Sequence, residues 1–505
     1  MSEDGTEGRS AGKAIHSIQG RGALCIGEPE RAAPRGWQWV RLDEIARLES
    51  GHTPSRGKPE YWGGDVGWVS IPDARTHHGG EIHDTTQTIT ELGLANSSAR
   101  VLPKGTVSLC RTAASIGYVL IFGRPLATSQ DFVCWVCTEA LDPRFLQYLL
   151  MTEGREIVRF GKGSTHPTIY FEAVQEFRVC LPPVPEQQRI VAKLDELLAR
   201  SRRAREALAE VPALVARYRE SVLAAAFRGD LTADWREANP AAEPADVSLA
   251  DARARRKAWQ VVSGALASLP QGWAWTALAN VLDELKNGIA TKPEGQSGVR
   301  ILRISAVRPG RLALQDVRYL SPDEPAFRAY ELADGDLLFT RYNGNADLVG
   351  ACAQVRGLTE RTVYPDKLIR GRVDRGTVIA GFVELAANHG TTRAAIRAST
   401  KSAAGQVGIS GADLRTAPVP VPPLAEQREI VRRVEAAFAR IDAVEAAVAE
   451  QRARLDAYDR SLLARAFAGE LVPQDPADEP AAALLARLRA ERGEAAPARG
   501  RRRRG

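Results

Sequence analysis

Two short polar stretches carry the side chains best suited to bind another molecule. GKGSTHPT covers residues 161–168, and RYNGN covers residues 341–345. Their glycines let the backbone approach a ligand closely. Their Arg, Lys, Asn, Ser and Thr side chains can hydrogen-bond to base edges in the major groove of DNA. The two stretches are therefore candidate binding loops, and each must be held by a stable scaffold.

Motifs for bond-making chemistry are missing from the sequence. No G-x-x-x-x-G-K-[ST] phosphate loop occurs, and no Gly-rich cofactor loop follows a strand-like run. ANPA at 238–241 differs at its third position from the Asn/Asp-Pro-Pro-Tyr/Phe motif of adenine methylation. PDK at 365–367 lacks the acidic-x-Lys pair that would complete a nuclease metal site. These absences agree with a chain that is not an enzyme, and we predict no catalytic residues.

Cysteine and histidine spacing does not predict a metal site. CWVC at 134–137 has zinc-like spacing, but structural zinc needs four ligands and no second pair is near. In a strand, positions three apart point to opposite faces, so we interpret these residues as buried thiols. His77, His78 and His83 are interpreted as part of a polar loop whose imidazoles could bond bases or phosphates.

The sequence is an internal repeat. PPVPEQQRIV at 182–191 returns as PPLAEQREIV at 422–431, and the match continues without a gap at an offset of 240 for about fifty residues. Upstream, PRGWQWVRLDEIARLESG (34–51) matches PQGWAWTALANVLDELKNG (270–288). LPKGTVSLCR (102–111) matches LADGDLLFTR (332–341), so Arg111 and Arg341 occupy equivalent positions. Each half is therefore a globular unit followed by a long helix.

The repeat sets the expected boundaries. The globular units are short apolar runs separated by Gly, Pro, Asn and Asp, which predicts strands with a few helices. We expect a flexible N-terminal extension (1–33), a first globular unit (34–181), a first long helix (182–231), a linker (232–269), a second globular unit (270–420), a second long helix (421–472) and a flexible basic tail (473–505).

Both long helices carry apolar residues at heptad spacing. This pattern indicates that the helices pack on each other, although each could instead pack on its own globular unit. Pro212 should kink the first helix because it removes a backbone hydrogen bond. Glu186 and Glu426 should lie in the first turns, at the positive ends of the helix dipoles. The predicted seam residues are Ile190, Leu194, Leu197, Leu208, Val215, Tyr218, Ile430, Val434, Ile441, Val448, Leu455 and Tyr458.

Composition fits a protein with a polyanionic partner. The 505 residues carry a formal net charge of +6, and 44% of them are hydrophobic. The sequence contains no run of about 18 apolar residues, so no membrane-spanning helix is predicted. The N-terminus lacks the apolar core of a signal peptide, so we expect a cytoplasmic protein.

The doubled plan resembles the specificity subunit of type I restriction-modification systems. The resemblance covers about residues 34–472 and includes GWQWVRLDEIARLESGHTPSR, GWVSIPD (67–73) and GDLLFTRYNGNADLVGACAQV (335–355). It implies an α+β chain with two mixed α/β target recognition domains, each followed by a long helix. It also implies that the two helices pack as an antiparallel coiled coil.

The resemblance also implies the function and partners. A specificity subunit recognises a bipartite site on double-stranded DNA and docks methyltransferase subunits, here expected to be two, and motor-nuclease subunits. S-adenosylmethionine, ATP and Mg are expected on those partners and no cofactor on this chain. Because the loops differ between the halves while the helices agree, we expect an asymmetric DNA site.

DNA-contacting residues are expected on polar loops of the globular units, although each could be an ordinary solvated side chain. In the first unit the candidates are Arg56, Lys58, Arg75, His77, Arg111, Ser115, Lys162, Ser164, Thr165 and His166. In the second unit they are Arg303, Arg308, Arg341, Tyr342, Asn343, Asn345, Arg393, Lys401 and Ser402.

Two other functions stay open at this point. The chain could be a coiled-coil scaffold without DNA specificity, which predicts no sequence preference in a binding selection. It could also be a self-contained DNA methyltransferase with an unrecognised site, which predicts methyl transfer without a partner.

Overall fold

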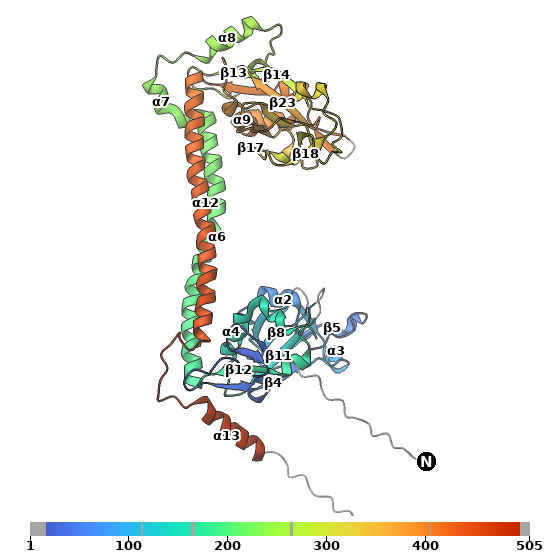
Figure 1. The fold of residues 1–505 in the computed structure, drawn as a ribbon, viewed down its shortest axis with the longest axis vertical. Helices are drawn as coiled ribbons and strands as arrows, with labels where there is room; N and C mark the ends of the chain where they lie inside the picture. Colours follow the sequence, from blue (N-terminus) through green and yellow to red (C-terminus); the bar gives the residue numbers. More distant parts are fainter. Residues whose placement is uncertain (1–16, 113–114, 163–166, 263–265, 404–405, 495–505) are drawn as a thin grey trace, which may run out of the picture. The chain divides into compact units, whose positions relative to one another are not determined.

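The computed structural model describes residues 17–112, 115–162, 167–262, 266–403 and 406–494 (Figure 1). The chain divides into two units. Unit 1 contains residues 1–208 and 450–505, and unit 2 contains residues 209–449. Each unit therefore includes part of both long helices, α6 (Val184–Arg228) and α12 (Leu424–Ala466).

Unit 1 is built on a five-stranded sheet of order β4-β11-β8-β9-β6. Its strands are β4 (Ala46–Ser50), β11 (Phe132–Cys137), β8 (Val107–Cys110), β9 (Val119–Phe122) and β6 (Glu81–Ile82). All neighbours are antiparallel except β6 and β9. Every residue of β8 and β9 is buried, as their apolar sequences VSLC and VLIF require. A smaller sheet joins β5 (Trp62–Val69) to β7 (Gln87–Ile89) and β10 (Ala127–Thr128).

Helix α4 (Pro143–Glu153) packs on the central sheet of unit 1. Asp142 caps its N-terminus by accepting from the Arg144 and Phe145 backbone N–H groups at 2.7 and 3.1 Å. The helix buries Phe145 and Leu149 in the main core of the unit. CWVC lies at the end of β11, where Cys134 is fully buried and its thiol is 3.3 Å from the Ser108 hydroxyl.

A second sheet of unit 1 corrects the expected N-terminal boundary. Its order is β1-β2-β12-β3, with strands β1 (Ile18–Gln19), β2 (Leu24–Ile26), β12 (Phe177–Leu181) and β3 (Gln38–Arg41). The expectation of a flexible extension over 1–33 is wrong for residues 18–26. The short apolar run LCI is buried because it pairs with β12, which lies about 150 residues later. Residues 1–16 lie outside the described part of the chain.

Unit 2 repeats the central sheet with the order β14-β23-β19-β21. These strands are β14 (Leu282–Asn287), β23 (Leu368–Val373), β19 (Leu337–Thr340) and β21 (Cys352–Gln354), all antiparallel to their neighbours. A second sheet contains β15 (Val299–Leu302), β18 (Val317–Leu320) and β22 (Thr362–Val363). Strands β13 (Ala274–Ala277) and β26 (Pro418–Val421) pair with each other. Helices α9 (Ala380–Asn388) and α10 (Gly390–Ala398) complete the core.

The linker and the tail each include a helix that joins a unit. In unit 2, α8 (Ala245–Arg255) begins where the Ala245 N–H donates to the Gly272 carbonyl oxygen at 2.9 Å. In unit 1, α13 (Ala481–Glu494) begins in the same way, with Ala481 donating to Gly36 at 3.1 Å. The expected flexible tail over 473–505 is therefore wrong for the start of α13. Ala481, Leu484 and Leu485 are buried in the core of unit 1 because their apolar side chains gain from leaving water.

The glutamine that the two repeated phrases share joins each long helix to its unit. The Gln187 side chain is fully buried, accepts from the Asp142 N–H at 2.8 Å and donates to the Ala140 and Pro182 carbonyls at 2.9 and 3.0 Å. Gln427 makes the equivalent three bonds in unit 2, with Ile379, Thr377 and Pro422. The identical side chain is needed twice because each unit has the same three backbone groups to satisfy.

The long helices contact each other within each unit. In unit 1, Ile190 and Leu194 share a core with Leu462 and Ala466. In unit 2, a separate cluster contains Val222, Leu223 and Ala226 of α6 together with Ile430 and Val434 of α12. Helix α6 continues through Pro212. None of the helices in the described part of the chain is long and apolar enough to span a membrane.

The predicted seam is wrong at its two tyrosines. Tyr218 is 54% exposed and Tyr458 is 44% exposed, whereas Val215, Val222 and Leu462 are buried. Val215, Val222 and Leu462 lie on equivalent rows of residues spaced by seven, and these rows stay buried or half-buried. The other row, which leads from Ile190 to Tyr218 and from Ile430 to Tyr458, turns from the core to solvent along each helix.

Candidate nucleic-acid interface

Three loops meet at one edge of the central sheet of unit 2. Because β14 and β19 run antiparallel to β23, both end where β23 begins. The Ile289 N–H after β14 donates to the Tyr364 carbonyl at 2.9 Å. The Arg341 N–H after β19 donates to the Lys367 carbonyl at 2.8 Å. The sheet therefore holds the loops starting at Ile289 and Arg341 beside the segment that precedes β23.

A fourth segment brings predicted residues from distant parts of the sequence together. Strand β20 (Tyr342–Asn343) pairs with β25 (Gln406–Gly408), which pairs with β24 (Lys401–Ala403). In this register Tyr342 and Lys401 both lie opposite Gly408. Five predicted residues therefore share one small sheet and its start: Arg341, Tyr342, Asn343, Lys401 and Ser402.

A hollow of about 500 Å³ opens among these loops, and we call it the basic hollow. Its charged lining consists of four basic side chains and one acidic one: Lys292, Arg303, Arg318, Lys367 and Asp366. A smaller hollow of about 160 Å³ shares Ile304 and Lys367 with it and is also lined by Tyr342 and Asn343. The predicted Arg303 is half exposed and lies 3.4 Å from Asp316.

Sequence reasoning missed Lys292, Arg318 and Lys367 on this surface. Lys367 belongs to the motif PDK, which lacks the acidic-x-Lys pair of a nuclease site and gives no other local signal of a binding role. No carboxylate among the described residues lies within ion-pair distance of Arg318 or Lys367. Their charges are therefore available to an anionic partner.

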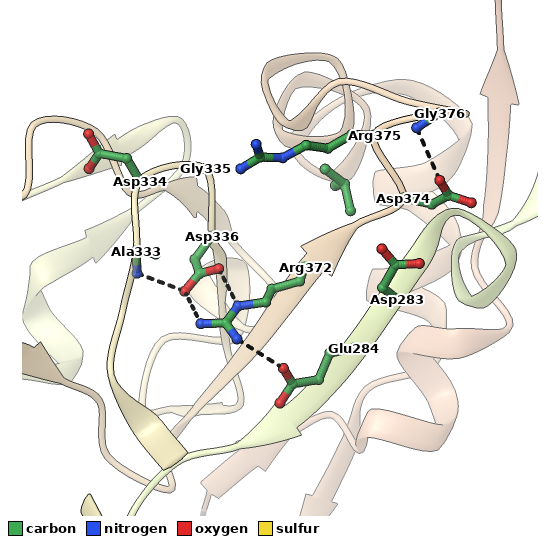
Figure 2. A pocket seen from close by; sticks show the side chains of 11 residues that line it. Asp283, Glu284, Ala333, Asp334, Gly335, Asp336, Arg372, Asp374, Arg375 and Gly376 are labelled. Carbon is green, nitrogen blue, oxygen red and sulfur yellow. Dashed lines mark hydrogen bonds and ion pairs between the residues drawn. The ribbon is translucent and has the colours of Figure 1, made fainter. Parts of the chain in front are cut away.

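The opposite end of the same sheet has the opposite charge (Figure 2). A hollow of about 750 Å³ there has five acidic side chains and two basic ones: Asp283, Glu284, Asp334, Asp336, Asp374, Arg372 and Arg375. Arg372 lies between Asp336, at 2.8 Å, and Glu284, at 3.4 Å. DNA is a dense polyanion, so only the Lys367 end of β23 suits it.

Unit 1 builds the same edge from the equivalent segments. The His52 N–H after β4 donates to the Thr128 carbonyl at 2.9 Å, and the Arg111 N–H after β8 donates to the Asp131 carbonyl at 2.8 Å. Thr168 forms bridges with both Thr112 and Lys162. The predicted residues Arg111 and Lys162 are therefore neighbouring parts of one surface. Ser164, Thr165 and His166 lie outside the described residues.

The loop after β4 carries a guanidinium stacked on tryptophan. The Arg56 guanidinium lies 4.0 Å from the ring centroid of Trp62 and 5.2 Å from that of Trp68. Its Nη1 donates to the Gln87 amide oxygen at 2.8 Å. Lys58 is exposed and donates to the Tyr61 hydroxyl at 3.1 Å. The Arg56 side chain is thus positioned by contacts inside unit 1.

Arg111 and Arg341, which the sequence predicts to contact DNA, also hydrogen-bond to neighbouring loops of their own units. Arg111 donates to the carbonyls of Gln130 and Ile169 at 3.1 and 3.2 Å. Arg341 donates to the Asp366 carbonyl at 3.3 Å, and its guanidinium lies 4.8 Å from the Tyr342 ring. Each side chain is half buried, so part of its hydrogen-bonding capacity is used within its unit.

The other predicted residues are placed differently. Arg75 is exposed in the last turn of α2 (Ile71–Thr76), and His77 is the residue at the end of that helix. Ser115 is half buried between β8 and β9. In unit 2, Arg308 is exposed in a two-strand hairpin, and its guanidinium donates to the Val307 carbonyl.

Arg393 and Asn345 shape the loop after β20. Arg393 donates to the Val349 carbonyl at 2.8 Å and to the Asp347 carbonyl. Burial lowers the pKa of Arg393 from its usual value. The Asn345 amide oxygen accepts from the Asp347 N–H at 2.9 Å. Arg393 therefore holds the backbone of this loop by hydrogen bonds.

Comparison with known proteins agrees with this architecture. Residues 34–212 match the family described as the type I restriction modification DNA specificity domain. The EcoDI specificity subunit of Escherichia coli is 31% identical over 366 residues, which are 69% of this chain and 76% of that protein. The StySPI specificity subunit of Salmonella potsdam is 27% identical over 479 residues, covering 91% and 96% of the two chains. The EcoKI specificity subunit of E. coli strain K12 is 36% identical, and the match spans 63% of its length.

Solved structures show the same fold. The HsdS subunit from Thermoanaerobacter tengcongensis superimposes with a TM-score of 0.55 and 21% identity, covering 88% of this chain and all of that one. A chain from a structure of a type I R-M system gives a TM-score of 0.60 at 21% identity, covering 87% of this chain.

The family match and the relatives compared above define this chain as a DNA specificity protein. This chain belongs to the family of type I restriction enzyme specificity subunits. The resemblance found in the sequence is therefore confirmed. Specificity subunits of type I systems are non-catalytic, so the catalytic activities lie on other subunits.

Proposed function

We propose that each unit reads one half of a bipartite DNA site with the four-segment edge described above. The main support is that two separately folded units direct equivalent loops, after β4 and β8 and after β14 and β19, to the same edge of the same kind of sheet. The charge difference between the two ends of β23 indicates which end faces DNA.

The two half-sites should differ because equivalent positions carry different side chains. Thr112 occupies the bridge position that Tyr342 has in unit 2, and Asp131 occupies the position of Lys367. A carboxylate accepts from the cytosine amino group, whereas a lysine donates to guanine acceptors or phosphate. Exchange of one for the other changes the bases that an edge favours.

The long helices are proposed to pack as an antiparallel coiled coil that sets the spacer between half-sites. In unit 1, Arg205 pairs with Asp456 and Asp459 at 2.9 and 2.7 Å. In unit 2, Arg219 pairs with Asp442 and Glu445 at 2.6 and 2.9 Å. Within each unit, the residue number of the α12 partner falls as the residue number along α6 rises. This trend supports helices that run in opposite directions. Half-sites on one DNA face lie about one helical turn, or about 34–36 Å, apart or at multiples of it.

Two methyltransferase subunits and the motor-nuclease subunits are the proposed protein partners. Tyr218 and Tyr458 occupy equivalent repeat positions and are both exposed, although most exposed positions of the two helices differ. Two copies of one surface feature suit two copies of one partner. S-adenosylmethionine, ATP and Mg²⁺ would bind to those partner subunits. The complex would act in the cytoplasm.

A binding selection tests this function. The full chain, alone and with its methyltransferase partner, is incubated with random duplex DNA, and the bound fraction is sequenced. We expect two different conserved blocks separated by a constant unread spacer. Enrichment of no sequence would favour the scaffold function. Methyl transfer from labelled S-adenosylmethionine by the chain alone would favour the self-contained methyltransferase.

A further inference from the structure

We propose that the basic hollow of unit 2 takes a single nucleotide that has left the base stack of its half-site. The base would lie on the apolar floor, and its phosphate would lie at the rim that carries Arg318 and Lys367. This inference rests on the proposed DNA-reading function and adds a specific ligand and a difference between the two units.

The floor and the rim of the hollow differ in chemistry. Ile289, Ile301 and Ile304 line the floor, where Ile304 is half buried and the other two are almost fully buried, while the charged groups belong to surrounding loops and to β18. Sites for flat organic ligands have this arrangement, with volumes of about 300–1,000 Å³ and a few polar groups. The hollow, at about 500 Å³, is within that range. A phosphate alone would not need an apolar floor.

The equivalent place in unit 1 is filled by the protein itself. Trp68 lies opposite Gln87 in the β5–β7 pair, just as Ile301 lies opposite Arg318 in the β15–β18 pair. Each also pairs in parallel with the strand that leads to the reading edge, Trp68 with Ala127 and Ile301 with Val363. In unit 1 the indole of Trp68 and the guanidinium of Arg56 thus occupy the place where unit 2 has a hollow.

Unit 2 therefore has more space than unit 1, because Ile301 stands where unit 1 has Trp68. It also has an additional cation, because Arg318 stands where unit 1 has Gln87. Gln87 uses its amide oxygen to hold Arg56, but Arg318 has no carboxylate partner among the described residues. Proteins that extrude a base hold it between apolar side chains and gain contacts that offset a few kcal/mol of unpairing. Unit 2 has the surfaces for this, whereas in unit 1 the space is already occupied.

Mismatch scanning tests the inference with the full chain and its methyltransferase partner. Each base pair of the half-site read by unit 2 is replaced in turn by a mismatch that keeps one strand unchanged, and the affinity is measured. A mismatch at a stacked, read position lowers affinity. At the extruded position it lowers the cost of unpairing, so we expect the affinity to rise about tenfold.

Variants of the hollow identify the protein group responsible. Ile301→Trp introduces the residue type of unit 1 and should abolish the rise in affinity. Arg318→Gln, on the exposed rim, avoids any packing change and should reduce the rise and lower the salt slope of binding by about one. Arg375→Gln is the matched control, since it removes the same charge beyond the other end of β23 and should leave the rise intact.

The outcomes separate this inference from the proposed function. Absence of sequence preference in every variant would overturn both. Specific binding in which no mismatch raises affinity, or in which the rise persists in both Ile301→Trp and Arg318→Gln, would overturn the extruded nucleotide and leave the DNA-reading function standing.

Discussion

The carboxylate of Glu186 accepts a hydrogen bond from the indole N–H of Trp37 at 3.0 Å, and both side chains are buried. The same pair exists in unit 2, where Trp273 donates to Glu426 at 2.9 Å. Trp37 and Trp273 are the first tryptophans of the matched GWQW and GWAW segments. Two repeated motifs, about 150 residues apart, are therefore two sides of one contact between the start of a long helix and its globular unit.

Loss of the indole donor should weaken this contact. Trp37→Phe keeps most of the ring but leaves the buried Glu186 carboxylate with one donor fewer. We expect a loss of about 1.5–3 kcal/mol in the free energy of unfolding, as for other hydrogen bonds to charged groups. Trp39→Phe is the control, because the Trp39 indole donates to the neutral Arg31 carbonyl near the surface. Equal losses in urea denaturation of the two variants would contradict the special role of Trp37.

Acid should remove the contribution of Glu429. Hydrogen bonds and ion pairs from Arg432 and Arg433 lower the pKa of Glu429 from 4.5 to about 2. A depressed folded-state pKa gives stability above the unfolded value, and this stability is lost as pH falls toward about 2. Glu429→Gln should therefore cost about 0.5–1 kcal/mol at neutral pH, and the difference from the native chain should narrow below pH 4.5.

Urea denaturation across this pH range measures the difference. Glu435→Gln, on the same helix, removes an exposed carboxylate that has no basic partner among the described residues. It should show little pH-dependent difference. A difference in the free energy of unfolding between the native chain and Glu429→Gln that stays constant at all pH values would show that the Glu429 carboxylate charge is not its source.

The corrected seam predicts unequal effects of truncation on α6. Leu223→Ala removes a buried side chain from the core of unit 2 and should cost about 2–5 kcal/mol. Tyr218→Ala removes a larger but exposed side chain and should change stability by less than about 0.5 kcal/mol. Calorimetric unfolding of both variants distinguishes them. If Tyr218→Ala were the more damaging, the original heptad assignment would be right.

Arg111 should affect stability as well as DNA binding. Arg111→Ala removes two hydrogen bonds to backbone carbonyls, and we expect a loss of about 1.5–3 kcal/mol together with weaker binding. Lys162→Ala removes an exposed charge from the neighbouring loop and should weaken binding without a change in unfolding. The expected pattern fails if the two variants unfold at the same urea concentration.

Shortening both long helices should change the spacer alone. Deletion of one heptad from each helix removes about 10 Å of length. At about 3.4 Å per base pair, the preferred spacer should shorten by about three base pairs while both half-sites remain. A binding selection with the shortened chain gives the result. Altered half-sites with an unchanged spacer would show that the helices do not set the distance.

The sequence by itself determined the doubled plan, the long helices and the family. These features depend on local signals: Pro182 and Pro183 before a helix, apolar residues at helical spacing, and an exact offset of 240 between the copies. Local signals survive without knowledge of long-range pairing, so they can be interpreted directly. The sequence also placed Arg341, Tyr342 and Lys401 among the candidates by residue type.

Only the tertiary structure decided which polar residues form one surface and which support it. Lys401 joins Tyr342 because two short strands both pair with Gly408, and Lys367 joins them because β23 starts where β19 ends. Such convergence depends on strands paired across tens of residues, which no local pattern specifies. The exposure of Tyr218 and the burial of Ala481, Leu484 and Leu485 likewise follow from packing against distant segments.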